Sequence, residues 1–181
     1  MSLALHGHHV LLIATLAFIT AVLTPNWYTS SNQPTLVINI FQICNNSLIP
    51  NPCSWTYKFL SENSSFVSIN LIYPILLSSL AIGCVLISLI SLFLSSWYLH
   101  RHTPERESVW LLILTILTTL TSFLLSCAVW TIMLTTNLQQ DTFGTHDIRL
   151  KEFGFSFWIN IGSSAVYLYT LIIYLIAVCK G

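Results

Sequence analysis

The side chains with the clearest chemical potential are the five cysteines, and two of them are spaced for a disulfide. Cys44 and Cys53 lie in a turn-rich stretch between long apolar segments. A zinc site is the alternative for paired cysteines, but zinc takes four ligands, and this stretch offers neither a histidine nor a second cysteine pair. A thiol oxidoreductase needs Cys-x-x-Cys, which the sequence lacks. We therefore predict a structural bridge between Cys44 and Cys53.

The other three cysteines lie in or beside apolar runs. Cys84 and Cys127 are inside such runs, where cysteine behaves as a small apolar packing residue. Cys179 lies at the end of the last run, where we expect the membrane edge. It is a candidate for palmitoylation, and both this and an unmodified thiol stay open.

Three histidines near the N-terminus have a spacing that resembles a metal cluster. They lie at what we expect to be a mobile terminus beside the membrane, so we do not expect metal binding. No other group combines a nucleophile, a base and a pocket. We predict no metal site, no cofactor and no enzymatic activity. The histidines are His6, His8 and His9.

Charge divides the chain into long uncharged stretches. A membrane interior roughly 30 Å thick takes about 20 residues of helix, and only helices or closed barrels satisfy their backbone groups there. The stretches between the charges are that long, so they are expected to be membrane-spanning helices. All six basic and six acidic side chains fall into four clusters: Lys58 with Glu62, Arg101 to Glu107, Asp141 to Glu152, and Lys180.

These stretches predict an all-α membrane protein, a four-transmembrane helix bundle in one domain over 1–181. The first span is the least obvious, because Pro25 interrupts its apolar run. A cleaved signal peptide is the alternative there, although no basic segment precedes the run. The spans are placed at about 4–27, 69–97, 109–134 and 154–178, with loops at 28–68, 98–108 and 135–153.

Orientation depends on the first loop, because basic residues are equally divided between the two sides. That loop carries two glycosylation sequons, at Asn45 and Asn63, together with the cysteine pair. Glycan transfer and disulfide formation both take place in the secretory lumen. We therefore expect the loop to be extracellular, both termini to be cytoplasmic, and the protein to reside in the plasma membrane.

The first loop has the composition of a small sheet. The run from Thr35 to Cys44 is rich in β-branched and aromatic residues, which is typical of a strand. A turn-rich stretch follows, and then a second alternating run from Cys53. A bridge that closes a loop of about ten residues contributes about 2 to 3 kcal/mol in the chain-entropy model. We predict a small disulfide-braced extracellular β-sheet.

Four positions resemble the motif of the claudin-like tetraspan superfamily, which includes claudins, peripheral myelin and epithelial membrane proteins, and calcium-channel gamma subunits. That family carries a tryptophan after the first span, then G-L-W-x-x-C and a second cysteine. Here Trp27 and the cysteine pair match, whereas Phe41 stands in place of the second tryptophan. The entry to the fourth span, F-G-F-S-F-W with Gly154 and Ser156, is similar to that of gamma subunits. The resemblance implies a four-helix bundle with an extracellular sheet.

Small and hydroxyl side chains mark the faces by which helices associate in lipid. They recur at helical spacing in the third span, and isolated small sites occur in the second and fourth. Packing within the bundle and docking of another membrane protein are both open interpretations. The residues are Thr115, Thr119, Ser122 and Ser126 in the third span, Ser79 and Gly83 in the second, and Gly162 in the fourth.

Two functions fit these features. Pumps and voltage sensors need ionisable groups at depth in the membrane, and the predicted spans contain no acidic or basic residue. The family resemblance implies either an auxiliary subunit that binds laterally to a channel or receptor, or an adhesive, barrier-forming junctional protein that self-assembles through its loops. We favour the auxiliary subunit. The expected partners are the lipid bilayer and another membrane protein, not nucleic acid.

Overall fold

A computed structural model of the chain describes residues 3–29, 36–45, 53–55, 72–100, 107–139 and 153–180. Four long helices make up most of these residues, and each is long and apolar enough to cross a membrane. This finding confirms the predicted four helices and indicates a multi-pass membrane protein. In chain order they are α1 Leu3–Leu23, α3 Ile72–His100, α4 Glu107–Gln139 and α5 Phe155–Lys180.

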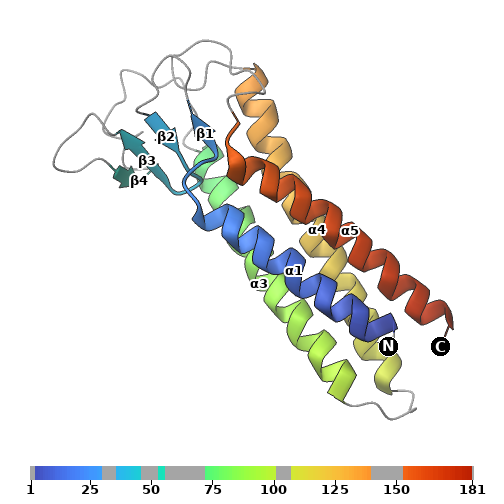
Figure 1. The fold of residues 1–181 in the computed structure, drawn as a ribbon. Coiled ribbons are helices and arrows are strands. Elements are labelled where there is room, and N and C mark those ends of the chain that lie inside the picture. The colour runs from blue at the N-terminus through green and yellow to red at the C-terminus, as the bar shows by residue number, and fades with distance from the viewer. Residues whose placement is uncertain are drawn as a thin grey trace.

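The helices form a bundle in which chain neighbours run antiparallel. Helix α1 packs against α5 and α3, and α4 packs against the same two helices. Figure 1 shows that both ends of the chain lie at one end of the bundle, while a small sheet lies at the other. This is the up-and-down arrangement that helices joined by short connections adopt.

Hydroxyl side chains are accommodated in these apolar helices because the helix backbone accepts their hydrogen bonds. The Thr15 hydroxyl donates to the Leu11 carbonyl oxygen at 2.9 Å, and the Thr119 hydroxyl donates to the Thr115 carbonyl oxygen at 2.7 Å. Since the acceptor lies one turn earlier in the same helix, neither hydroxyl needs water.

Helix α1 ends at Leu23, four residues before the predicted end at Trp27. Proline has no N–H and restricts the residue before it, so Pro25 stops the helix. The chain turns tightly here, with the Trp27 N–H donating to the Pro25 carbonyl oxygen at 3.1 Å. The other three helices begin and end within a few residues of the predicted spans.

In the part of the chain that the structure describes, the sheet has four antiparallel strands in the order β1-β2-β3-β4, so β1 and β4 are the outer strands of this described part. Cys44 pairs with Cys53 in its register, and Gln42 pairs with Trp55. The strands are β1 Tyr28–Thr29, β2 Leu36–Ile38, β3 Gln42–Asn45 and β4 Cys53–Trp55.

The run from Thr35 to Cys44, which we expected to form one strand, is divided by a turn. The Asn39 N–H donates to the Gln42 carbonyl oxygen at 2.8 Å, and the Asn39 side-chain oxygen accepts the N–H of Ile40. Asparagine forms such local bonds readily, and they compete with continuation of a strand. The two halves therefore pair with each other as β2 and β3.

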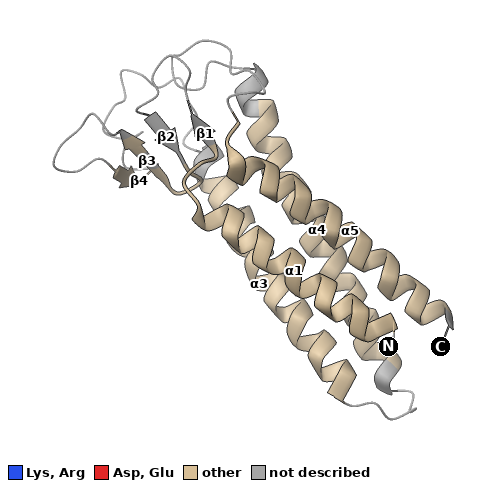
Figure 2. Ribbon diagram, viewed as in Figure 1, with Lys and Arg blue, Asp and Glu red and all other residues tan. Residues whose placement is uncertain are grey.

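Figure 2 shows no lysine, arginine, aspartate or glutamate on the part of the ribbon that is not drawn in grey, in keeping with the long uncharged stretches of the sequence. A hydrophobic core runs along the bundle and continues to the base of the sheet. At that end it contains the buried side chains Trp27, Ile40, Phe153 and Phe157.

Candidate functional sites: a junction, a sheet and two kinds of helix face

Besides the cysteine pair, four motif residues carry the family resemblance, and three of them, Trp27, Gly154 and Ser156, meet where α1 ends and α5 begins. The Trp27 side chain is completely buried, and its indole N–H donates to the Ala21 carbonyl oxygen at 2.7 Å. The backbone N–H of Gly154 donates to the Trp27 carbonyl oxygen at 3.0 Å, and that of Ser156 donates to the Asn26 carbonyl oxygen at 3.1 Å. The turn after α1 therefore satisfies N–H groups at the start of α5 that have no partner within that helix.

Side chains add to this junction. The hydroxyl oxygens of Ser156 and Thr24 lie 2.6 Å apart. Gly154 lies so close to the turn that a Cβ at this position would overlap the Asn26 carbonyl oxygen. Motif positions that are more than a hundred residues apart in sequence thus form one contact that ties the first and last helices together.

The fourth motif residue, Phe41, belongs to the turn between β2 and β3, where the sheet rests on the bundle. Ile40 is 1% exposed, and Phe41 packs against the same core. The Ser78 hydroxyl of α3 donates to the Ile40 carbonyl oxygen at 3.3 Å. This turn anchors the sheet to the helices.

The predicted disulfide is confirmed: Cys44 and Cys53 are bonded to each other and join β3 to β4. The thiols are thus consumed by the bridge, which leaves none for the zinc alternative. Of the two predicted glycosylation sites, Asn45 is the last residue of β3, and Asn63 lies outside the described residues.

The hydroxyl stripe of α4 points into the bundle. All four of its members are fully buried. The hydroxyl oxygens of Thr119 and Ser91 lie 2.8 Å apart, and the Cys84 thiol donates to the Ser122 carbonyl oxygen at 3.3 Å, so the stripe packs against α3. It is not available to a partner. The members are Thr115, Thr119, Ser122 and Ser126.

Two polar layers join α1, α3 and α5, and the sequence analysis did not anticipate them. In the first, the Tyr167 hydroxyl oxygen lies 2.8 Å from that of Ser88, and it donates to the Thr15 hydroxyl at 3.4 Å. One residue from each of the three helices meets in this layer. All three side chains are buried.

The second layer repeats the first at a distance of seven residues on every helix. The Tyr174 hydroxyl oxygen lies 2.6 Å from that of Ser95, and His8 Nδ1 lies 3.1 Å from the same oxygen. A seven-residue repeat keeps the same face of each helix toward its neighbours in a left-handed bundle. This spacing of seven residues is the sequence pattern from which the two layers could have been predicted.

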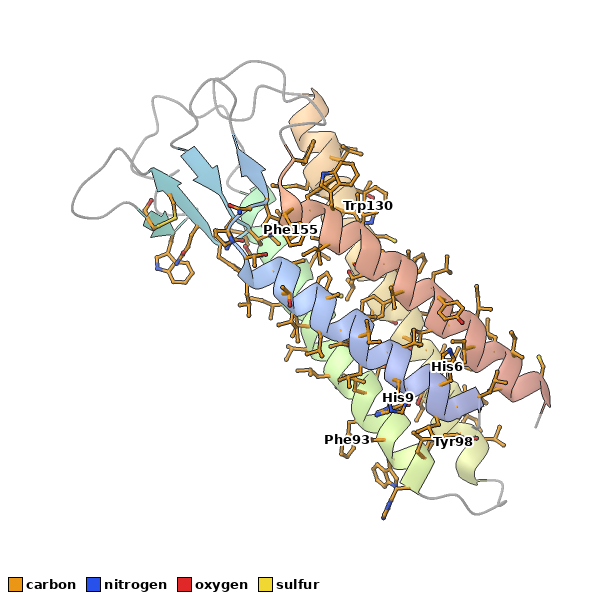
Figure 3. All side chains as sticks on the ribbon, viewed as in Figure 1. His6, His9, Phe93, Tyr98, Trp130 and Phe155 are labelled. Atoms are coloured by element: carbon orange, nitrogen blue, oxygen red, sulfur yellow. A yellow bond between two sulfur atoms is a disulfide. The ribbon has the colours of Figure 1, made fainter. Side chains whose placement is uncertain are left out.

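The placement of His8 corrects an expectation. We expected the three N-terminal histidines to lie at a mobile terminus, but α1 begins at Leu3 and includes all three in a regular helix. His8 bonds inward, while Figure 3 shows His6 and His9 near the end of the bundle where the termini lie. The His6 ring meets that of Tyr169 edge-on, with centroids 6.3 Å apart.

A third polar contact joins α4 to α5 around Asn160, which is fully buried. The Ser126 hydroxyl donates to the Asn160 side-chain oxygen at 2.8 Å, and the hydroxyl oxygens of Ser126 and Ser164 lie 2.7 Å apart. Among the described residues, the Asn160 side-chain nitrogen has no hydrogen-bond partner. Asparagine was not among the small and hydroxyl residues by which the sequence analysis recognised helix contacts.

The remaining small residues differ in what surrounds them. Gly162 is exposed on α5, and a Cβ there would meet no atom within 4 Å. Ser79 is also exposed on α3, whereas Gly83 is half-buried near Leu125. The exposed Cys179 lies near the end of α5.

These sites are suited to holding helices together and to contact between proteins. Within the described ranges, no three histidine, cysteine or acidic residues gather to form a metal site. The chain matches no protein-family model and no curated protein, so the function has to be argued from these contacts.

Proposed function

We propose that this chain is a non-enzymatic, claudin-like multi-pass membrane protein that binds laterally to a larger membrane complex as an auxiliary subunit of a channel or receptor. The four apolar helices support the membrane assignment. Motif residues meeting at one junction support the family resemblance, because Trp27, Gly154 and Ser156 have a shared structural role. In this proposal the sheet is extracellular, both termini are cytoplasmic, and the protein lies in the plasma membrane.

The observation that carries lateral binding is the outward face of α5. Gly162 and Ala165 are both exposed and lie one helical turn apart. Trp158, one turn before them, is 49% exposed, and Tyr169, one turn after, is 52% exposed. The result is a small-residue gap between two aromatic side chains. Such gaps allow the backbone of a second helix to approach closely, which is how helices associate in lipid.

The internal polar contacts leave the hydroxyl stripe of α4 covered and so exclude it as a binding face for a partner. The hydroxyl stripe of α4 is used within the bundle, so a partner cannot use it as well. Of the two glycines among the predicted small sites, Gly162 has the more open surroundings, because a Cβ at Gly83 would contact Leu125. We therefore place the partner helix against α5.

Purification of the native protein in a mild detergent tests the proposal directly. We expect it to migrate with a larger membrane complex that contains a second, different membrane protein. Gly162→Leu fills the gap and should release the partner. Leu86→Phe adds bulk to the outward face of α3, where Leu86 is 56% exposed, and should leave the complex intact. Recovery of the wild type only as a monomer or a self-oligomer contradicts lateral binding to a partner.

A second candidate function is adhesion, and the braced sheet is the observation that favours it. A disulfide between β3 and β4 holds a rigid surface outside the bundle, and Trp55 on the edge strand β4 is 51% exposed. Such a surface is suited to contact with another copy of the protein. Expression in cells that lack junctions separates the two functions, because adhesion predicts cell aggregation and intramembrane strands in freeze-fracture, and lateral binding predicts neither.

A further inference from the structure

The contacts between the sheet and α3 show how far the exposed Trp55 of β4 lies from the start of that helix. The first fixed point is Ile40, whose carbonyl oxygen accepts the hydrogen bond from Ser78. Helix α3 begins at Ile72, six residues earlier. At about 1.5 Å per residue, Ser78 lies about 9 Å along that helix. The turn that carries Ile40 therefore reaches the first two turns of α3.

Strand pairing connects Ile40 to Trp55. Gln42 follows Ile40 by two residues, so the two lie at most about 7 Å apart, the length of two residues of extended chain. Trp55 pairs directly with Gln42, and side chains paired in this way lie about 5 Å apart. Because β3 leads away from the bundle and β4 returns, Trp55 lies at the end of β4 nearest the helices, and the bridged cysteines lie farther out. Trp55 is thus held close to the level of the first turns of α3.

Exposed apolar side chains lie at the same end of the molecule as Trp55. Trp55 is 51% exposed, and at the same end of α3 the apolar side chains Ile75 and Leu76 are 57% and 41% exposed. Both residues lie in the first two turns of α3. The described part of the sheet carries no charged residue that would have to be removed from water on contact with lipid (Figure 2). Tryptophan is enriched where a membrane meets water, since its ring is largely apolar and its N–H can bond to headgroups.

We propose that Trp55 is an interfacial anchor, with its indole in the headgroup layer of the bilayer on the sheet side. The partner of this edge of the sheet is the lipid surface itself. The anchor holds β3 and β4 down beside the bundle, and the disulfide fixes the two strands as one unit. This inference needs the helices to span the membrane, but it does not depend on lateral binding to another protein.

The test uses the whole protein, labelled with 5-fluorotryptophan, in lipid nanodiscs. The chain has six tryptophans, and Trp55→Phe identifies one fluorine resonance by its loss while the other five report that the fold is intact. Two paramagnetic probes are then compared, a gadolinium chelate attached to a lipid headgroup and the same chelate free in water. Trp27, which is completely buried at the same end of the molecule, is the internal reference.

We expect the headgroup probe to broaden the Trp55 resonance more than the aqueous probe does, and to broaden it more than that of Trp27. Stronger broadening by the aqueous probe would mean that the indole is in water, as a surface for adhesion between cells requires, and would overturn the proposal. No broadening by either probe would mean that protein covers the indole, which overturns it equally.

Discussion

At the scale of single residues, the clearest feature is that two glycines, Gly154 just before α5 and Gly162 within it, meet opposite surroundings. A Cβ at Gly154 would overlap a backbone carbonyl oxygen of the neighbouring turn, whereas a Cβ at Gly162 would meet nothing. Backbone cannot move aside as a flexible side chain can. The first glycine is therefore needed for packing within the chain, and the second leaves an outward gap.

Gly154→Ala is expected to lower stability by about 1 to 3 kcal/mol, the usual cost of overpacking. The matched control is Gly162→Ala, which adds the same methyl group within α5 and should cause no loss. Thermal unfolding of the purified proteins in one detergent measures both. Equal melting temperatures for the two variants would show that the junction between α1 and α5 is looser than described.

A second difference at this scale concerns the tyrosines of α5. Tyr174 bonds to Ser95 inside the bundle, while Tyr169 is 52% exposed. Tyr174→Phe should destabilise the protein by about 0.6 kcal/mol, the average for a hydrogen bond between helices in a membrane protein, and Tyr169→Phe should be neutral. A double-mutant cycle with Ser95→Ala isolates the pair. Additive effects in that cycle would argue against the bond.

At the scale of elements, the sheet depends on its bridge. A few strands of two to four residues are marginal in water, and the bridge restricts the unfolded loop, so its loss costs about 2 to 3 kcal/mol. Cys44→Ser and Cys53→Ser should each reduce delivery to the cell surface and change mobility on non-reducing gels. Cys179→Ser, at the far end of α5, serves as the control. Normal delivery of both bridge variants would mean that the sheet folds without its disulfide.

The association of the helices depends on buried polar contacts. The two polar layers recur at intervals of seven residues, so the same faces of α1, α3 and α5 meet twice along the bundle. Because lipid gives helices no hydrophobic reason to associate, such bonds and close packing define which faces touch. The layer that contains His8 lies near the N-terminus, because His8 belongs to the second turn of α1.

At the scale of the whole molecule, the arrangement predicts topology. Both termini lie at the end opposite the sheet (Figure 1), so they share one side of the membrane. We expect glycosidase treatment to shift the mobility of the wild type but not of a variant with Asn45→Gln and Asn63→Gln. A new sequon added after the C-terminus should remain unmodified. A glycan at that added site would reverse the proposed orientation.

Much of this architecture could be read from the sequence. Four helices follow from uncharged apolar stretches, because lipid leaves the backbone few other ways to satisfy its polar groups. Helix α1 ends at Leu23 because of Pro25, whereas the predicted span continued past this proline to Trp27. The division of the strand run at Asn39 was missed, since a single residue that bonds locally can turn an otherwise continuous strand.

The sequence by itself determined the helices, the bridge and the residues able to join helices, because these depend on composition and on spacing along one chain. Only the tertiary structure decided which of those residues face inward. Thr115 and Gly162 are both small and lie in apolar helices, yet one is fully buried and the other is exposed. That difference arises from which helix lies alongside, and the spacing of small residues along one helix does not say whether another helix of the same chain covers them.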